Sequence, residues 1–164
     1  MKLRITTRDV AQIGVMIATI EAAKMALSVI PGVEIVTLLI ILYSLTFGKK
    51  IYYVLAAFVL IEGCLYGFGV WWIMYLYIWP LLAFLTQMFW KNESVILWSV
   101  FSGVYGLCFG ALCSIPYYFV GGAKMAVTWW VSGIPTDIAH GISNFILCLI
   151  LFKPLKNALE KLSR

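Results

Sequence analysis

Charged residues are scarce in this sequence. Of its 164 residues, 12% are charged and 63% are hydrophobic, whereas a soluble domain has about a quarter charged residues and about half apolar ones. So few charges cannot cover the surface of a water-soluble globule of this size. Several apolar stretches approach the ~20 residues needed to cross a bilayer. The composition predicts a polytopic integral-membrane protein, with residues 1–164 forming one domain because no polar linker divides the chain.

The chain also lacks the usual signatures of catalysis and of metal binding. It has one histidine, and its four cysteines form no close C-x-x-C pair, so no ligand set typical of zinc is present. No glycine-rich phosphate-binding loop occurs. No motif of nucleophilic catalysis places a serine or cysteine beside Asp137 and His140. We therefore expect a non-catalytic protein without a bound metal or a covalently attached cofactor.

Six apolar segments are expected to be transmembrane helices, because backbone polar groups must be satisfied within lipid. Their approximate ranges are 10–30, 34–47, 51–69, 71–90, 94–120 and 123–152. The first reads as a spanning helix rather than a cleavable signal peptide, since its apolar run is long and carries Glu21 and Lys24. The last is expected to be interrupted at Gly133-Ile134-Pro135. Residues 153–164 are expected to form a short amphipathic cytoplasmic tail.

The basic residues predict the orientation of these helices. With the N-terminus in the cytoplasm, nearly all of them fall on the inner side, as the positive-inside rule requires. These residues are Lys2, Arg4, Arg8, Lys49, Lys50, Lys91, Lys153, Lys156, Lys161 and Arg164. Only Lys124 falls outside, and Lys24 lies within a span. One span more or fewer would scatter the charges over both sides, so we expect six helices with both termini cytoplasmic. Basic residues at span ends also argue against a nucleic-acid partner.

Acidic and aromatic residues gather instead toward the outer side. The acids there are Glu21, Glu34, Glu62 and Asp137, and the aromatic residues are Tyr66, Trp71, Trp72, Tyr75, Tyr117, Tyr118, Trp129 and Trp130. An interfacial belt explains part of the aromatic set. A belt would, however, appear at both faces of the membrane. The excess on one side favours an aromatic pocket that opens outward.

Charged residues within membrane spans are functional candidates by default. Glu62 lies one turn before Tyr66 on the third helix. It is expected either to bind a polar group of a ligand or to pair with Lys24. Glu21 and Lys24 stand three residues apart on the first helix, and such a spacing also allows them to pair with each other.

The last span presents three polar side chains on one helix face. Asp137, His140 and Asn144 follow the i, i+3, i+7 spacing. Irregular backbone is tolerated at membrane depth only where it lines protein or a wet cavity, so the expected break at 133–135 favours a cavity here. Trp129 and Trp130 precede it and are placed to cover a flat ligand. The alternative is that Asp137 caps the second half-helix and His140 is a core residue.

Small residues recur every four positions on the first helix, at Gly14, Ala18, Ala22 and Ala26. Such a stripe allows close approach of another helix. The approaching helix belongs either to this chain or to a partner subunit. Sequence spacing alone leaves both possibilities open.

The whole chain resembles the substrate-binding S-component of energy-coupling factor (ECF) transporters, the vitamin importers of prokaryotes. The resemblance rests on a six-helix layout of this length with both ends inside and on the small-residue stripe of the first helix. It rests also on "IPGVEIVTLLIILYSLTFGKK", a loop and short second helix of the type seen in these proteins. It implies a multi-pass protein of the prokaryotic plasma membrane.

The resemblance implies a subunit that binds one vitamin at the extracellular side and topples in the membrane to release it inward. Its partners would be a transmembrane coupling subunit and two cytoplasmic ATPases, which use ATP and Mg. The small residues Gly14, Ala18, Ala22 and Ala26 would contact the coupling subunit. The expected substrate-binding residues are Glu34, Glu62, Tyr66, Trp71, Trp72, Tyr75, Trp129, Trp130, Asp137, His140 and Asn144.

The aromatic residues favour a flat or large conjugated ligand, because rings bury much area. The pattern is most similar to the cobalamin-specific S-components, so cobalamin is the expected vitamin, with riboflavin and pyridoxine types as alternatives. Rivals from other classes are a small integral-membrane enzyme acting on lipid, a self-contained transporter or channel, and a structural membrane subunit. The acids are spread over four segments and no internal repeat is evident, which disfavours the first two. A structural subunit would not explain the polar last helix.

Overall fold

The structure is a computed structural model that describes residues 6–163, and this part of the chain consists of helices and short connections without a β-strand. In chain order the elements are α1 (Thr7–Leu27), α2 (Val36–Phe47), the 3-10 helix η1 (Gly48–Lys50), α3 (Ile51–Tyr66), α4 (Val70–Met88), α5 (Val95–Leu107), α6 (Phe109–Cys113) and α7 (Ile115–Ser163). The all-α prediction is confirmed. Lys2, Arg4 and Arg164, which the charge argument counts as cytoplasmic, lie outside the described residues.

Within residues 6–163, four stretches are long and apolar enough to cross a membrane. They are Thr7–Leu27, Val36–Tyr66, Val70–Met88 and Ile115–Leu162. The second contains α2, η1 and α3, and α5 is apolar but shorter, with 13 residues. These stretches indicate a multi-pass membrane protein. The number of six spans and the cytoplasmic position of both termini stay predictions.

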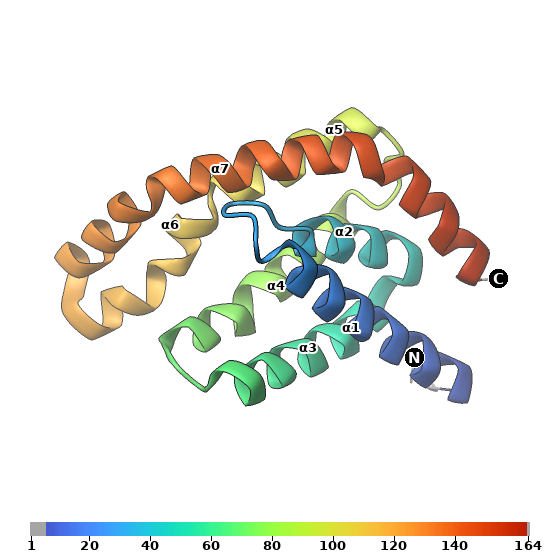
Figure 1. The fold of residues 1–164 in the computed structure, drawn as a ribbon, viewed down its shortest axis with the longest axis horizontal. Helices are drawn as coiled ribbons and strands as arrows, with labels where there is room; N and C mark the ends of the chain where they lie inside the picture. The colour runs from blue at the N-terminus through green and yellow to red at the C-terminus, as the bar shows by residue number, and fades with distance from the viewer. Residues whose placement is uncertain (1–5, 164) are drawn as a thin grey trace.

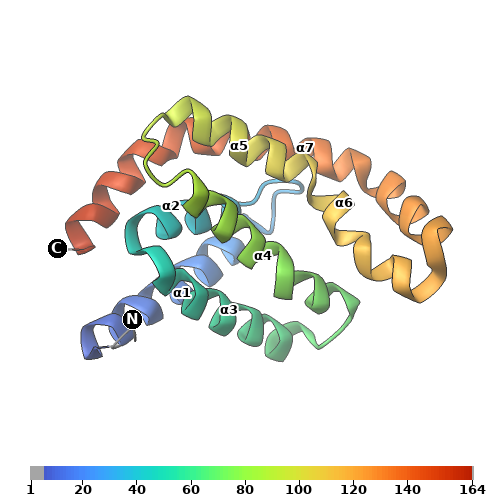
Figure 2. The ribbon, with the colours of Figure 1, turned by 180° about the vertical axis from the view of Figure 1, so that it is seen from behind.

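The helices run between two ends of the molecule. The start of α1, the end of α7 and the α2–α3 and α4–α5 connections lie toward one end, which we call the inner end (Figures 1 and 2). The α3–α4 connection and the turn into the long part of α7 lie toward the other, which we call the outer end. Lys49, Lys50 and Lys91 belong to the inner connections and Lys124 follows the outer turn. The basic residues are therefore separated along the molecule as the charge pattern predicts.

Helix α2 forms the centre of the core. Nine consecutive residues, from Val36 to Ser44, are buried, and a helix that is apolar all round must be covered on every side. α2 packs against α1, α4 and α7. With 12 residues it is about 18 Å long, shorter than the ~30 Å hydrocarbon core of a bilayer. The chain before it forms a loop that reaches α7, where the Ser143 hydroxyl donates a hydrogen bond of 2.8 Å to the Gly32 carbonyl.

Helix α5 lies beside the middle part of the much longer α7 (Figures 1 and 2). Glycine permits this close approach. A Cβ on Gly103 would lie 3.1 Å from the carbonyl oxygen of Gly141, and one on Gly106 would lie 2.9 Å from the Gly141 nitrogen. Small residues at such contacts let helix backbones meet closely. The contact fixes the face of α7 that carries His140 and Asn144.

The expected interruption at Gly133-Ile134-Pro135 is wrong. Within α7 only Gly121 and Gly122 have non-helical backbone angles, and Pro135 lies inside continuous helix. Proline removes one helical hydrogen bond, but its φ is compatible with a helix and membrane helices tolerate it where neighbours support the backbone. The turn falls where Gly122 has a φ of 73°, which favours glycine. The predicted tail likewise continues α7 to Ser163 instead of forming a separate helix.

Two alanine substitutions test where the backbone of α7 is irregular. Gly133→Ala should raise the free energy of unfolding by up to about 1 kcal/mol, because alanine favours a helix interior and its Cβ meets no atom within 4 Å. Gly122→Ala also meets no atom within 4 Å, but its φ is positive, so it should lower stability by about 1 kcal/mol. Denaturant titration in detergent micelles measures both. If Gly133→Ala lowered stability and Gly122→Ala raised it, the irregular backbone of α7 would lie at residues 133–135 instead.

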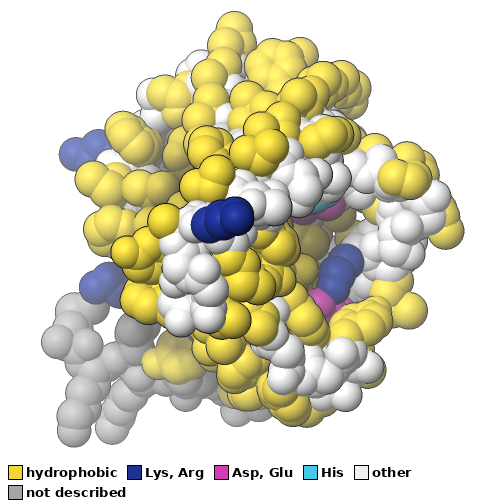
Figure 3. Space-filling view, turned by 90° about the vertical axis from the view of Figure 1, so that its left-hand side faces the viewer, with side chains coloured by type: hydrophobic (Ala, Val, Ile, Leu, Met, Phe, Trp, Pro, Cys, Tyr) yellow, Lys and Arg dark blue, Asp and Glu magenta, His cyan; other side chains and the backbone are white. Residues whose placement is uncertain are grey.

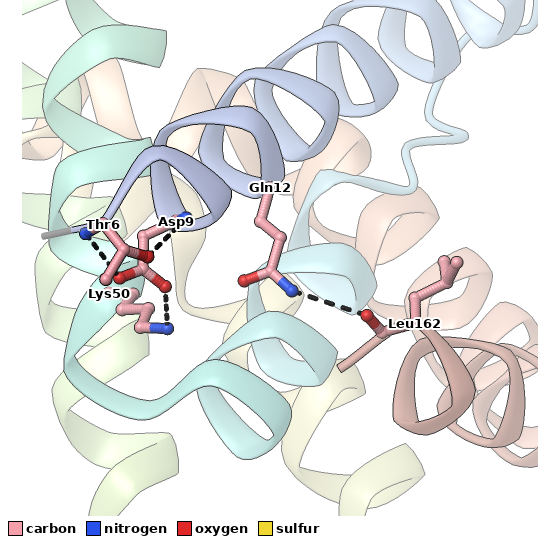
Figure 4. A network of polar contacts seen from close by, with 5 residues as sticks. All are labelled: Thr6, Asp9, Gln12, Lys50 and Leu162. Atoms are coloured by element: carbon pink, nitrogen blue, oxygen red, sulfur yellow. Dashed lines mark hydrogen bonds and ion pairs between the residues drawn. The ribbon is translucent and has the colours of Figure 1, made fainter. Parts of the chain in front are cut away.

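Polar contacts hold the inner end together (Figure 4). Thr6 and Asp9 cap the start of α1 reciprocally, with N–H···O distances of 2.9 and 3.2 Å. Asp9 also pairs with Lys50, at the junction of η1 and α3. The Gln12 side-chain amide donates to the Leu162 carbonyl at 3.4 Å. This hydrogen bond links the end of α7 to α1.

Candidate ligand-binding site

A partly buried ion pair joins α1 to α3 toward the outer half of the molecule. The Lys24 ammonium contacts the Oε2 atom of Glu62, whose side chain is 1% exposed while that of Lys24 is 29% exposed. Lys24 also lies over the Tyr66 ring, 4.9 Å from its centroid, and 5.9 Å from that of Tyr75. Rings attract a cation over their faces. The lysine is thus held between one carboxylate and two aromatic rings.

A second carboxyl group accompanies this pair. Glu21, one turn before Lys24 on α1, interacts with both Lys24 and Glu62. Both of its oxygens are buried without a hydrogen-bond partner among the described residues. The expected Glu21–Lys24 ion pair does not form, because the lysine side chain is directed to Glu62. Pairing of Glu62 with Lys24, one of the two predicted roles, is confirmed.

Two cavities adjoin the lysine. One, of about 430 Å³, is lined by Lys24, Met25, Ser28, Glu62, Tyr66, Trp71 and Tyr75. The other, of about 150 Å³, is lined by Lys24, Glu34, Val36, Tyr75, Trp79, Gly106, Phe109, His140 and Asn144. Lys24 and Tyr75 line both cavities and therefore separate them. Every α-helix contributes at least one residue to these two cavities, whereas η1 at the inner end contributes none. Binding sites commonly form in this way between packed helices.

The face at the outer end is hollowed (Figure 3). Hydrophobic and uncharged atoms form the rim, and two groups of acidic atoms lie inside. One group is beside a basic side chain and the other is beside histidine. This arrangement agrees with the residues that line the two cavities. A polar interior behind an apolar rim suits a ligand with an apolar body and a few polar groups.

Three buried polar atoms in the cavity walls have no hydrogen-bond partner among the described residues. They are Glu62 Oε1, Trp79 Nε1 and Asn144 Nδ2. Their residues are 1%, 3% and 2% exposed, respectively. Buried polar atoms are nearly always hydrogen-bonded, so each such exception needs an explanation. The acceptor belongs to a residue that lines the 430 Å³ cavity, and the two donors belong to residues that line the 150 Å³ cavity.

Most of the expected binding residues come together at these cavities. Those that line one or both are Glu34, Glu62, Tyr66, Trp71, Tyr75, His140 and Asn144. The Glu34 carboxylate also accepts hydrogen bonds from the Thr37 hydroxyl and, at 3.0 Å, from the Thr37 backbone N–H. It thereby stabilises the start of α2. His140 meets the Phe109 ring edge-on at 6.0 Å. Their placement supports a shared site, and ligand contact stays a prediction.

Four of the expected residues line neither cavity. Trp72 donates a hydrogen bond of 2.8 Å to the Val59 carbonyl and joins α4 to α3. Asp137 accepts one of 2.9 Å from the Gly110 N–H and holds α6 against α7, so it does not cap a second half-helix. Trp129 stacks on Tyr117 at 4.9 Å and, with Lys124, lines a separate open hollow. Trp130 is exposed.

Sequence reasoning did not assign Lys24, Trp79 and Phe109 to the binding site, although all three line the 150 Å³ cavity. Glu21, three residues before Lys24 on the same helix, offered a local ion-pair partner, so the sequence did not indicate that Lys24 lines the cavities. Trp79 lies one turn after Tyr75 on α4, and this spacing on one helix face could have identified it. Within residues 6–163, no group of three His, Cys, Asp or Glu side chains could hold a metal ion.

Comparison with protein-family models, with curated proteins and with solved structures found no match for this chain. The case for its function therefore depends on the site and the fold.

The small-residue stripe on α1 adds one observation to that case. Gly14, Ala18, Ala22 and Ala26 are all exposed on α1, and a Cβ on Gly14 would meet no atom within 4 Å. Within the described residues, this stripe does not serve to pack α1 on its neighbours.

Proposed function

We propose that this chain is the substrate-binding S-component of an ECF-type importer, which binds a vitamin from outside a prokaryotic cell. The observation that carries the proposal is the pair of cavities around Lys24 toward the outer end, lined by Trp71, Tyr75 and Trp79. Aromatic walls with a few unpaired polar atoms are typical of small-molecule sites. The chain takes no part in ATP hydrolysis, which two cytoplasmic ATPases perform with Mg.

The exposed stripe on α1 is the proposed docking surface for the transmembrane coupling subunit. Gly14, Ala18, Ala22 and Ala26 leave a shallow surface on which a partner helix can approach closely. The ligand cavities face the interior of the bundle instead. Binding and assembly thus use different surfaces, and variants should affect them separately.

The cavity volumes bear on the choice of vitamin. About 430 Å³ and 150 Å³ are available on the two sides of Lys24 and Tyr75, at the scale of a drug-sized ligand. Cobalamin, a corrinoid with an attached nucleotide, is larger than such ligands and would also require space beyond the rim. The volumes therefore favour the riboflavin or pyridoxine type over cobalamin.

Calorimetric titration of the detergent-purified chain with cobalamin, riboflavin and pyridoxine vitamers tests the proposal. Saturable binding of one vitamin at a single site is expected. Trp71→Ala should weaken that binding by roughly 30-fold, as loss of a central aromatic anchor does, and leave assembly with the coupling subunit and ATPases intact. Absence of binding by folded protein to any vitamin would contradict the proposal, and a lipid-hydrolysis screen would then test the enzyme alternative.

The docking surface is tested by co-purification with the coupling subunit. Ala18→Leu should abolish the complex while ligand affinity stays within about twofold, because the added bulk prevents close helix approach. The matched control is Ala56→Leu, the same substitution at an exposed position of α3, which should leave both properties unchanged. Equal loss of the complex in both variants would locate the docking surface elsewhere.

A further inference from the structure

The charges around Lys24 do not balance. Glu62 and Glu21 bring two carboxyl groups to a single lysine. His140, Glu34 and Asn144 line the neighbouring cavity and add no fixed cation. Lys124 lines a different hollow. An unneutralised carboxylate at membrane depth is costly, so the cluster requires one further positive charge or a proton.

The geometry offers a place for that charge. Lys24 occupies Oε2 of Glu62, and Oε1 has no hydrogen-bond partner although the residue is 1% exposed. Glu62 lines the 430 Å³ cavity together with Tyr66, Trp71 and Tyr75. A cationic group at Oε1 would gain a charge-assisted hydrogen bond and the attraction of the ring faces. Glu21 already brings a second carboxyl group beside Glu62, so a carboxylate of a ligand in this place would meet like charge.

The opposite side of the site has complementary polarity. Trp79 Nε1 and Asn144 Nδ2 are hydrogen-bond donors without partners, and both residues line the 150 Å³ cavity. They fit an acceptor group, such as a hydroxyl or carbonyl oxygen. A ligand with a cationic group toward Glu62 is therefore expected to place an acceptor group toward Trp79 and its ring against Tyr75, which lines both cavities.

We propose that the site selects a vitamin with a positively charged nitrogen, either a protonated amine or a quaternary nitrogen of a heteroaromatic ring, and binds it at Glu62, beside which Glu21 adds a second carboxyl group. This inference rests on the proposed function, since it takes the ligand to be a vitamin. The carboxylates supply the selectivity, and Lys24 holds Glu62 in position. Proton uptake by Glu21 in place of a cation is the alternative that the test must exclude.

Pyridoxamine and pyridoxine form a matched pair of probes, because one carries a protonated amine where the other has a hydroxyl group. Thiamine serves as a permanently charged probe. In calorimetric titrations of the full chain at neutral pH, we expect pyridoxamine or thiamine to bind at least ~10-fold more tightly than pyridoxine. Glu62→Gln should lower the affinity for the charged vitamin by roughly 10-fold or more and leave that for pyridoxine unchanged.

A second variant keeps the inference testable if Glu62→Gln fails to fold. Glu21→Gln keeps the Lys24–Glu62 pair and should also reduce the preference for charged vitamins. Glu93→Gln removes a carboxylate that is 84% exposed at the inner end and should change nothing. Failure of both charged vitamins to bind, or a preference that survives both site variants, overturns the inference. Tight binding of riboflavin or cobalamin in that case leaves the proposed function standing, whereas no binding of any vitamin overturns both.

Discussion

Lys24→Met is expected to lower the free energy of unfolding by about 3 kcal/mol, the lower range for removing one partner of a buried ion pair. The physical reason is that the substitution leaves Glu62 and Glu21 buried with no cation. Unfolding in mixed detergent micelles measures the change. Ligand affinity should fall as well, because Lys24 holds Glu62 in position and lines both cavities.

A double-mutant cycle separates the charge effect from lost packing. Lys24→Met combined with Glu62→Gln should be more stable than Lys24→Met alone by about 1 kcal/mol or more, since the second change removes the unpaired carboxylate. The matched control is Lys156→Met. Lys156 contacts the exposed Glu93 at 3.5 Å, and its loss should cost no more than about 1 kcal/mol. Equal effects of the two lysine substitutions would show that the inner and outer pairs contribute alike.

Gly106→Ala is expected to lower stability by about 2 kcal/mol, through overpacking between α5 and α7. The new Cβ would lie 2.9 Å from the Gly141 nitrogen and from the His140 carbonyl carbon. Both are backbone atoms, so no side-chain rotation relieves the contact. Since Gly106, His140 and Asn144 line the same cavity, separation of the helices should also weaken ligand binding. The two losses should appear together in unfolding and calorimetric measurements.

Gly14→Ala serves as the matched control for this substitution. Its Cβ would meet no atom within 4 Å, and alanine in a helix interior is favourable by up to about 1 kcal/mol. Stability should therefore stay the same or rise, with ligand affinity unchanged. A Gly106→Ala protein as stable as Gly14→Ala would mean that α5 and α7 do not approach as closely as Gly103, Gly106 and Gly141 indicate.

Much of the helix layout could be predicted from the sequence. Long apolar runs leave helices as the available structure in lipid, and glycine and proline mark most of the ends. The predicted ranges 34–47 and 71–90 agree closely with α2 and α4. The range 94–120 is instead divided among α5, α6 and the start of α7. No proline stands near Cys108, so the division between α5 and α6 was not evident, whereas Pro116 lies in the first turn of α7 and marks its start.

Residues of the candidate site were predictable where helical spacing decides the face. Glu62 with Tyr66, and His140 with Asn144, each lie four positions apart, and each pair lines one cavity. Trp71 and Trp72 could not be distinguished in this way. Adjacent positions on a helix point about 100° apart, so only one of them faces the cavity, while the other donates to Val59.

By itself, the sequence determined an apolar all-α chain with basic residues at one end and acids with aromatic rings toward the other, because these properties depend on composition and local spacing. The tertiary structure alone decided that Lys24 pairs with Glu62 on α3 rather than with Glu21 on its own helix. It also decided that α7 continues through Pro135. The ion pair depends on packing between helices distant in sequence, where neighbouring side chains outweigh the local preferences that spacing reveals.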